Sequence, residues 1–330
     1  MCVAFWTLEH PDYALILCAN RDEYLARPTR PAAFHSFGST TDEDRSGRVL
    51  SGRDISAGGT WLGLAPSAGR VALLTNITEP PLQALPSSRG ALVPTYLLAP
   101  PDTPLDALYP PTAQYAGFNL LLLGAQWASS PSAPDAPRLH FPHASLLTNN
   151  GAWGTVVARA LRPEERVCSG VSNAAESVDG VPWPKVAEGR RLFQDAVAGD
   201  VAVDADAQDT ALSTRLFALL RTTAAVPVRA REDLRQTICV SPLTVNAGGY
   251  YATRLATVLL VRRDGTGVFI ERDVWRVGAG GEGLELTEPG EGERRFRIQE
   301  LARSKSNIEE QRGATTDVSI FWVRGAPDIF

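Results

Sequence analysis

The sequence predicts an α+β fold built mostly from antiparallel sheets. Segments with strand-like patterning stand towards both ends of the 330-residue chain, and two segments with helical periodicity lie between them. Strands and helices do not alternate regularly, as they would in a parallel α/β fold. Near the C-terminal end, Asp264-Gly265 separates two apolar runs, which is a strong signal of an antiparallel hairpin.

The chain opens with two predicted strands. Residues 3–8 are rich in β-branched and aromatic side chains, and turn-forming residues follow them. Residues 14–19 form a continuous apolar run, too short for a helix and typical of a buried strand. The polar residues 20–23 come directly after it. This abrupt change places them at the rim of a sheet, where site residues often lie.

The central part of the chain predicts a second hairpin, a short helix and another buried strand. The hairpin strands are residues 58–65 and 69–76, the helix is 91–99, and the strand is 118–124. Residues 126–137 are rich in Pro, Ser and Ala, and we expect a surface insertion there.

Two longer helices are predicted next, over residues 185–198 and 207–220. Pro184 stands at a first-turn position, where proline is tolerated, and the second segment repeats leucine at helical spacing. The hairpin around Asp264-Gly265 follows. Residues 277–295 are rich in Gly and Glu and predict a loop, with a short strand near residues 295–299.

Composition excludes several classes of function. The hydrophobic fraction of 44% and the charged fraction of 21% are those of an ordinary globular protein. A net charge of −5 disfavours a nucleic acid or an anionic membrane as partner. No apolar run reaches the length of a transmembrane segment, and the first residues resemble neither a secretory signal nor a transit peptide. We therefore expect an intracellular, cytoplasmic protein without a transmembrane segment.

Cysteine and histidine spacing predicts neither a metal site nor disulfides. The four cysteines are widely separated, which fits a reducing compartment. His140 and His143 have a spacing that could bind a metal on a helix, but Pro142 disfavours a helix there. Gly58-Gly59 is not followed by a phosphate-binding pattern. We expect no metal and no cofactor.

Cys2 is the most informative single residue. Removal of Met1 would leave Cys2 with both a thiol and a free α-amine, and an adjacent amine is one known base for a side-chain nucleophile. The amine has an ordinary pKa of about 7.7–8.0, so part of it is unprotonated at neutral pH. The alternative is structural, because free cysteine is among the most buried residue types.

An N-terminal thiol that cleaves an acyl bond needs an acceptor for its amine, donors for the oxyanion and a nearby cation. Asp22 is the candidate acceptor, Asn76 and Asn173 are the candidate amide donors, and Arg254 is the candidate cation. Each also has a structural interpretation, because Asp and Asn are common turn residues and an arginine at a strand start is often solvated.

Four further residues are candidates for a substrate pocket. Asn20 and Arg21 lie at the predicted rim beside Asp22. Trp61 and Trp183 are interpreted as pocket wall or core. These assignments complete the set of site residues that the sequence predicts.

The motifs together resemble the NRDE family, also called the transport and Golgi organisation protein 2 family. They are residues 1–5 (Met-Cys-Val-Ala-Phe), 19–23 (Ala-Asn-Arg-Asp-Glu), 58–63 (Gly-Gly-Thr-Trp-Leu-Gly), 72–76 (Ala-Leu-Leu-Thr-Asn), 88–90 (Ser-Arg-Gly), 117–120 (Gly-Phe-Asn-Leu), 170–173 (Gly-Val-Ser-Asn) and 253–257 (Thr-Arg-Leu-Ala-Thr). The resemblance covers nearly the whole chain in the expected order. It implies one domain over residues 1–330, with insertions near 38–48, 126–137 and 274–293.

That family in turn resembles the cysteine N-terminal-nucleophile hydrolases, which implies a four-layer αββα sandwich of two antiparallel sheets. By motif, Cys2 matches their nucleophile, Asp22 the acid that holds its amine, Asn76 and Asn173 their amides, and Arg254 their late arginine. One departure concerns the early Arg-Asn-x-Asp motif, which here reads Ala-Asn-Arg-Asp over residues 19–22. Arg21 would therefore project to the face opposite Asp22 if the strand continues.

The resemblance implies two functions. The first is an amidohydrolase that cleaves the carbon–nitrogen bond of an acyl amide or related acyl compound. The second is a non-catalytic role in secretory-pathway or Golgi organisation, or in the trafficking of lipid (acyl-coenzyme A) or haem, through the same pocket. The expected partners are a small acyl or haem-like ligand and secretory-pathway proteins. The expected location is the cytoplasm, in association with the Golgi or mitochondria.

Overall fold

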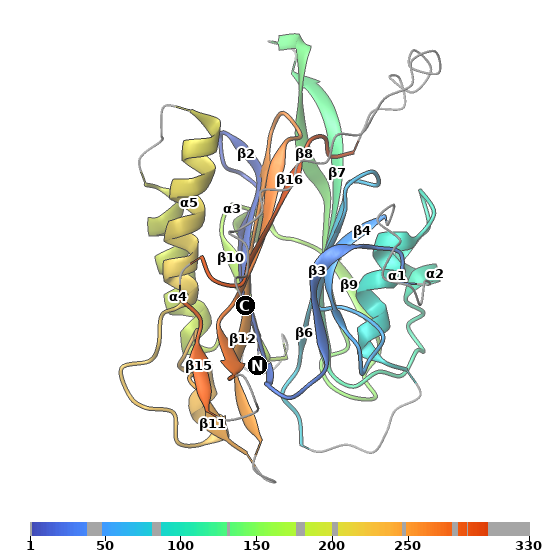
Figure 1. Cartoon of the computed structure of the whole chain (residues 1–330). Coiled ribbons are helices and arrows are strands. Elements are labelled where there is room, and N and C mark those ends of the chain that lie inside the picture. The colour runs from blue at the N-terminus through green and yellow to red at the C-terminus, as the bar shows by residue number, and fades with distance from the viewer. Residues whose placement is uncertain are drawn as a thin grey trace.

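The computed structural model describes residues 2–37, 48–80, 87–130, 133–175, 182–199, 204–245, 249–278, 283–288 and 290–302. Two antiparallel sheets lie face to face in it, and helices cover their outer faces (Figure 1). Residues 38–47, which make up most of the first predicted insertion, lie outside the described residues.

The first sheet contains the N-terminal strand. Its order is β10 (Ser169–Val171), β1 (Val3–Thr7), β2 (Tyr13–Tyr24), β12 (Tyr250–Arg262), β13 (Gly267–Asp273) and β16 (Glu293–Ile298), and β11 (Leu243–Thr244) also pairs with β12. Two central strands, β2 and β12, are therefore far apart in sequence. Their register places Asp22 opposite Thr253, just before a bulge at Arg254.

The second sheet is a meander. Its order is β3 (Thr29–His35), β4 (Val49–Asp54), β5 (Leu62–Ala65), β6 (Arg70–Asn76), β7 (Phe118–Ser130), β8 (Ala133–Thr148) and β9 (Val157–Ala160). Consecutive strands pair throughout, as short antiparallel connections allow. A separate short hairpin consists of β14 (Trp275–Val277) and β15 (Leu284–Leu286).

Helices flank the two sheets. They are η1 (Arg89–Ala91), α1 (Leu92–Leu98), α2 (Leu105–Leu108), α3 (Pro163–Val167), α4 (Pro184–Val197), α5 (Ala205–Leu220) and η2 (Arg231–Arg235). The long helices α4 and α5 lie along the outer face of the first sheet, and α1 lies against the second (Figure 1). The predicted α+β class and the αββα layering of two antiparallel sheets are confirmed.

Side-chain alternation builds three apolar layers from these elements. In β1, Ala4 and Trp6 contact the core between the sheets, whereas Val3 and Phe5 contact the core under α4 and α5. In β7, alternate leucines divide in the same way between the inter-sheet core and the core under α1. β1 and the leucine run of β7 are thus buried on both faces, which explains why these parts of the sequence are nearly continuous apolar runs.

A glycine lets α4 approach β1 closely. A Cβ atom built on Gly189 would lie 2.0 Å from Cζ of Phe5. One turn later, the ring of Phe193 stacks on the same phenylalanine, with ring centroids 6.4 Å apart. The face of α4 that carries residues 189 and 193 therefore rests directly on the N-terminal strand.

Several sequence predictions need correction. Residues 20–23 do not end the second strand, because β2 continues to Tyr24. The described parts of 126–137 continue β7 and β8 instead of forming an irregular loop, and this hairpin projects beyond the rest of the sheet (Figure 1). Within 277–295, the described residues include β15 and the end of β14 in addition to loop.

Candidate active site

Cys2 lies directly before β1, at the end of the strand nearest Asp22 on β2. The register pairs Val3 with Asn20, so the chain before Val3 continues alongside Arg21 and Asp22. The cysteine is half-buried. Burial raises the pKa of the Cys2 thiol, and the negative charge of Asp22 raises it further. A backbone hydrogen bond with Asp22 and the positive charge of Arg21 act in the opposite direction.

The Asp22 carboxylate is held in a fixed orientation. Its side chain is buried, and its Oδ1 accepts a hydrogen bond of 2.6 Å from the hydroxyl of Thr253 on β12. That hydroxyl in turn accepts a hydrogen bond of 2.7 Å from the backbone N–H of Val240. Because the donors come from rigid strands and a tightly bonded loop, Asp22 keeps its position relative to Cys2.

Lys185 completes the charged groups of this region. It stands in the first turn of α4, and only 1% of it is exposed. Burial lowers the pKa of its ammonium, while the negative charges of Asp22 and Cys2 favour the protonated form. The ammonium also lies 5.6 Å from the centre of the Trp183 ring. This lysine is not among the site residues that the sequence predicts, because burial of one residue leaves no pattern in the sequence.

A segment after β10 links Cys2 to the second sheet. The hydroxyl of Ser172 donates a hydrogen bond of 2.7 Å to the carbonyl oxygen of Cys2. The neighbouring Asn173 is buried, and its Nδ2 donates to the carbonyl oxygen of Asn76 at 2.5 Å. The side chain of Asn76 is exposed at the end of β6. The two predicted amide residues are therefore in contact, beside the residue that binds Cys2.

Arg21 lies on the opposite face of β2 from Asp22, as its position in the motif predicts. Its guanidinium is 3.2 Å from Oδ2 of Asp54 on β4 and stacks on Trp61, 4.2 Å from the ring centre. Two predicted pocket residues thus contact one another between the sheets. The arginine is buried, and its contacts with Asp54 and Trp61 hold its side chain in position.

The other predicted site residues bind backbone carbonyl groups. Asn20 donates to the carbonyl oxygens of Leu220 at 2.8 Å and Ile238 at 3.0 Å, which ties the end of α5 to β2. Arg254 donates to the carbonyl oxygens of Leu25 at 3.2 Å and of Arg27. These contacts hold the chain that surrounds the site.

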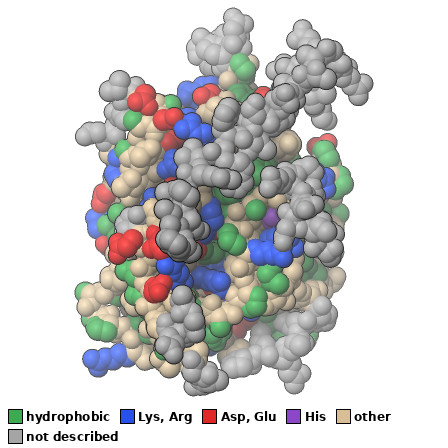
Figure 2. Space-filling model, in the orientation of Figure 1, with side chains coloured by type: hydrophobic (Ala, Val, Ile, Leu, Met, Phe, Trp, Pro, Cys, Tyr) green, Lys and Arg blue, Asp and Glu red, His purple; other side chains and the backbone are tan. Residues whose placement is uncertain are grey.

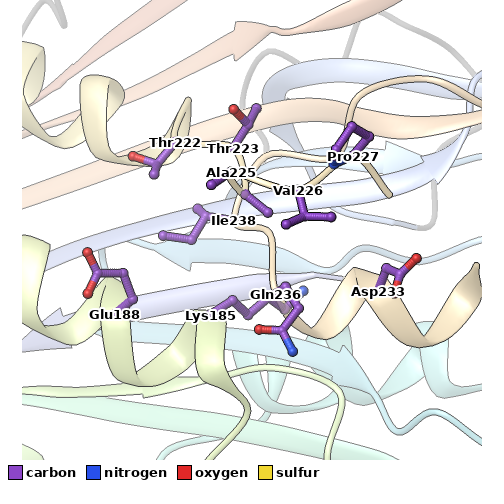
Figure 3. Close-up of a pocket in the computed structure, with 11 residues that line it drawn as sticks. Lys185, Glu188, Thr222, Thr223, Ala225, Val226, Pro227, Asp233, Gln236 and Ile238 are labelled. Atoms are coloured by element: carbon purple, nitrogen blue, oxygen red, sulfur yellow. The ribbon is translucent and has the colours of Figure 1, made fainter. Parts of the chain in front are cut away.

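A cavity of about 520 Å³ lies on the helix side of the first sheet, between α4, η2 and the chain that follows α5 (Figure 3). Its lining residues are Lys185, Glu188, Thr222, Thr223, Ala224, Ala225, Val226, Pro227, Asp233, Gln236 and Ile238. Lys185 lines this cavity, and the negative charges of Asp22 and Cys2 raise the pKa of its ammonium against the effect of burial. The predicted pocket residues Asn20, Arg21, Trp61 and Trp183 lie outside this lining.

Three further observations concern the charge of the surface, the helices and metal binding. Basic side chains gather near the middle of the face seen in Figure 2, while acidic side chains are more frequent on its left side. Within the described ranges, no helix has the length and hydropathy of a membrane span. No group of three or more His, Cys, Asp or Glu side chains among the described residues could hold a metal ion.

Comparison with known proteins identifies relatives over most of the chain. Residues 1–276 match the family described as Transport and Golgi organisation 2. A Transport and Golgi organization protein 2 homolog from Bos taurus is 31% identical over 291 residues, which cover 83% of this chain and 93% of the relative. The homolog from Homo sapiens is 30% identical with the same coverage of both chains.

Among solved structures, similarity is weak. A Caenorhabditis elegans N-acylethanolamine-hydrolyzing acid amidase ortholog aligns with a TM-score of 0.42 and 10% identity, over 79% of this chain and 92% of that chain. A similarity of this size carries no argument about the function of the present protein.

Proposed function

The chain belongs to the Transport and Golgi organisation 2 family, and we propose that it is a hydrolase with an N-terminal cysteine nucleophile. The observation that carries the proposal is the placement of Cys2 at the start of β1, beside a buried carboxylate on the neighbouring strand. Carbon–nitrogen bonds of acyl amides are the proposed targets. The proposal requires that Met1 be removed, so that Cys2 carries a free α-amine.

The proposed reaction has two halves. In the first, the Cys2 sulfur forms a bond to the acyl carbonyl carbon, and the α-amine takes the thiol proton and passes it to the leaving nitrogen. The carbon–nitrogen bond breaks, the free amine departs, and a thioester remains. In the second half, water attacks the thioester carbonyl, the carboxylic acid is released, and the thiol recovers its proton. Asp22 is the proposed acceptor that orients the α-amine.

Asn76 and Asn173 are the proposed oxyanion donors. Each side-chain amide has two N–H groups, and Asn173 uses one for the Asn76 carbonyl oxygen. Loss of an oxyanion donor typically lowers kcat by about 10²–10³-fold. The role of Arg254 in this scheme is to hold the chain after β2, through its hydrogen bonds to carbonyl groups there.

The first prediction tests turnover directly. Wild type, Cys2→Ser and Cys2→Ala proteins are assayed for amine release from a panel of N-acyl amides of different chain length. We expect release by wild type, a large loss in Cys2→Ser and complete loss in Cys2→Ala, because a hydroxyl is a much weaker nucleophile than a thiolate.

Cys168→Ala is the control, because it removes another thiol, a buried one that hydrogen-bonds to the carbonyl oxygen of Arg190 on α4. Its activity should equal that of wild type. Amine release that survives in Cys2→Ala would show that Cys2 is not the nucleophile and would overturn the proposal.

A second candidate function is ligand binding without turnover, as part of secretory-pathway or Golgi organisation. The names of the relatives suggest it, and the cavity bounded by α4 and η2 is the observation that favours it. The described residues that line the cavity include none of His, Cys, Met and Tyr, which are the usual haem ligands. An acyl ligand therefore fits this cavity better than haem.

Titration distinguishes these ligands. Cys2→Ala protein is titrated with an acyl-coenzyme A and, separately, with haem while the visible spectrum is recorded. The binding role predicts saturation by the acyl compound at one defined stoichiometry. Failure of both ligands to saturate would remove this candidate. Association with the Golgi or mitochondria, from a cytoplasmic location, is part of the same proposal and is tested by fractionation of cells.

A further inference from the structure

We propose that the cavity between α4, η2 and the chain after α5 binds a small carboxylate with a short apolar body, and that Lys185 binds the carboxylate group. The inference rests on the ligand-binding role proposed above for this cavity and names its class of ligand. It requires no turnover at Cys2. The size of the cavity, a buried cation in its wall and the apolar surface across from that cation support it.

The cavity has the size and the fixed walls of a small-molecule site. Its volume of about 520 Å³ lies within the usual range of about 300–1,000 Å³. The hydroxyl of Thr237 accepts a hydrogen bond of 3.1 Å from the N–H of Ala224 and donates one of 2.6 Å to the carbonyl oxygen of Cys239. The N–H of Cys239 donates to the carbonyl oxygen of Thr222 at 2.8 Å. These bonds hold the chain after α5 in place, so the cavity is formed before a ligand binds.

A buried cation lies in the wall of the cavity. Lys185 lines the cavity from the first turn of α4, and only 1% of it is exposed. Because little water reaches this ammonium, its attraction to an opposite charge is screened far less than that of a surface lysine. An ammonium has three N–H groups, so it can bind a ligand carboxylate in addition to its contacts within the protein.

The surroundings of Lys185 fix its ammonium and add to the positive potential. The ammonium lies 5.6 Å from the centre of the Trp183 ring, within the range of a cation–π interaction. The guanidinium of Arg235 lies 5.3 Å from the centre of the same ring. The described first turn of α4 contains no acidic residue that would offset the positive end of the helix dipole. An anion is therefore favoured near Lys185.

The described lining also includes two carboxylates, and other groups of the protein already bind both of them. Glu188 accepts hydrogen bonds of 2.8 and 3.1 Å from Arg191. Asp233 accepts from two backbone N–H groups just before η2, at 2.8 and 2.9 Å. Glu188 is also exposed, so water screens its charge. These acids therefore attract a cationic ligand only weakly, whereas the buried Lys185 repels it.

Apolar side chains account for much of the remaining lining. Val226 and Pro227 belong to the chain after α5, and the buried Ile238 lies in the same wall. Figure 3 shows Lys185 and Gln236 on one side of the cavity and Val226 and Pro227 on the other. The Gln236 amide can donate a further hydrogen bond to a carboxylate. A bare anion would leave the apolar wall uncovered, so a carboxylate with a short apolar chain matches the cavity better.

Calorimetric titration with four small probes tests this assignment. Hexanoate, 1-hexanol, hexylamine and acetate are titrated separately into the wild-type protein at pH 7. We expect hexanoate to saturate at one molecule per chain, about tenfold tighter than 1-hexanol or more, because hydrogen bonds to charged groups are strong. Hexylamine should bind more weakly than 1-hexanol. Acetate should bind more weakly than hexanoate, because it buries less apolar surface.

Variants locate the ligand. Lys185→Met should bind hexanoate no more tightly than 1-hexanol, and Ala224→Phe should lose hexanoate binding because the ring fills the cavity. Gln194→Ala, at an exposed position of α4 outside the lining, is the control and should bind hexanoate as wild type does. Cys2→Ala should also bind like wild type. If Lys185→Met or Ala224→Phe does not fold, as judged by circular dichroism, Lys185→Gln or Ala225→Phe replaces it.

Three results would overturn the inference: no saturation by hexanoate, equal affinity for hexanoate and 1-hexanol in wild type, or unchanged hexanoate affinity in folded Lys185→Met. Loss of hexanoate binding in Cys2→Ala would also overturn it, because the ligand would then lie at Cys2. Failure to hydrolyse amides concerns the proposed hydrolase and leaves the carboxylate site intact. If hexanoate saturates but neither an acyl-coenzyme A nor haem does, the trafficking role loses its ligands while the carboxylate site stands.

Discussion

At the scale of single residues, the central feature is the hydrogen-bonded carboxylate of Asp22. Thr253 donates to Oδ1 of Asp22 and accepts from the N–H of Val240, so one hydroxyl joins β2, β12 and the chain before β11. All three groups are buried. The orientation of Asp22 therefore depends on a residue that is not itself placed to touch a substrate.

Thr253→Val tests this dependence. Valine has nearly the same shape, but it leaves the Asp22 oxygen and the Val240 N–H without this partner. We expect a loss of about 1–3 kcal/mol in the free energy of unfolding, measured by urea denaturation. Thr214→Val, on the exposed face of α5, is the control and should change stability by less than about 0.5 kcal/mol. Equal stability of Thr253→Val and wild type would contradict the described hydrogen bonds.

The sequence predicts some of the residues around Cys2 but not others. Cys2, Asp22, Asn76 and Asn173 fall within motifs at strand ends, and the structure brings them to one region. The burial of Lys185 could not be inferred in this way, because it results from packing against other elements. The motifs predict Asn20 and Arg254 as site residues, but the side chains of both bind backbone carbonyl groups.

At the scale of elements, helix α4 positions the site through its close contact with β1. The approach depends on the absence of a side chain at Gly189. Glycine lowers intrinsic helix stability by about 1 kcal/mol relative to alanine. Its presence in the interior of α4 is therefore explained by packing.

Gly189→Ala should destabilise the protein despite the better helix propensity of alanine. The new methyl group would overlap the Phe5 ring, and overpacking of this kind typically costs about 1–3 kcal/mol. Urea denaturation measures the change. Gln194→Ala, at an exposed position of the same helix, controls for helix propensity. A more stable Gly189→Ala protein would mean that α4 does not approach β1 as described.

Strands with a clear apolar pattern in the local sequence could be predicted, whereas strands that form only through pairing with other strands could not. The hairpin strands around residues 66–68 and around Asp264-Gly265 were predicted, because both strands of each hairpin are apolar and adjacent in sequence. The sequence does not predict β8, because Pro137 and Pro142 interrupt its pattern. Proline cannot donate to a strand ladder, so the pairing of this segment with β7 and β9 could not be inferred locally.

At the scale of the whole molecule, the two sheets are joined by polar contacts next to Cys2. Thr75 on β6 donates a hydrogen bond of 2.6 Å to the carbonyl oxygen of Ser172. The Nδ2 of Asn119 on β7 donates to the carbonyl oxygens of Ser172 at 3.2 Å and Ala174 at 2.9 Å. The second sheet thus fixes the segment that binds the carbonyl oxygen of Cys2.

Asn119→Ala should loosen this junction. The variant removes a buried donor from two carbonyl groups, so we expect a loss of about 1–3 kcal/mol in stability. Hydrogen exchange should become faster in residues 169–175 than in wild type, while β12 and β13 keep their protection. Unchanged exchange in residues 169–175 would show that the second sheet does not hold this segment. The control is Gln126→Ala, at an exposed position of the same strand.

The proposed hydrolysis depends most on the chemical state of Cys2, and mass spectrometry of the intact purified protein tests that state directly. We predict a mass that corresponds to the chain without Met1 and with an unmodified N-terminal cysteine. Peptide mapping should place a free α-amine on Cys2. A retained Met1, or a blocked α-amine on Cys2, would contradict the proposed mechanism, because the proposed base would not exist.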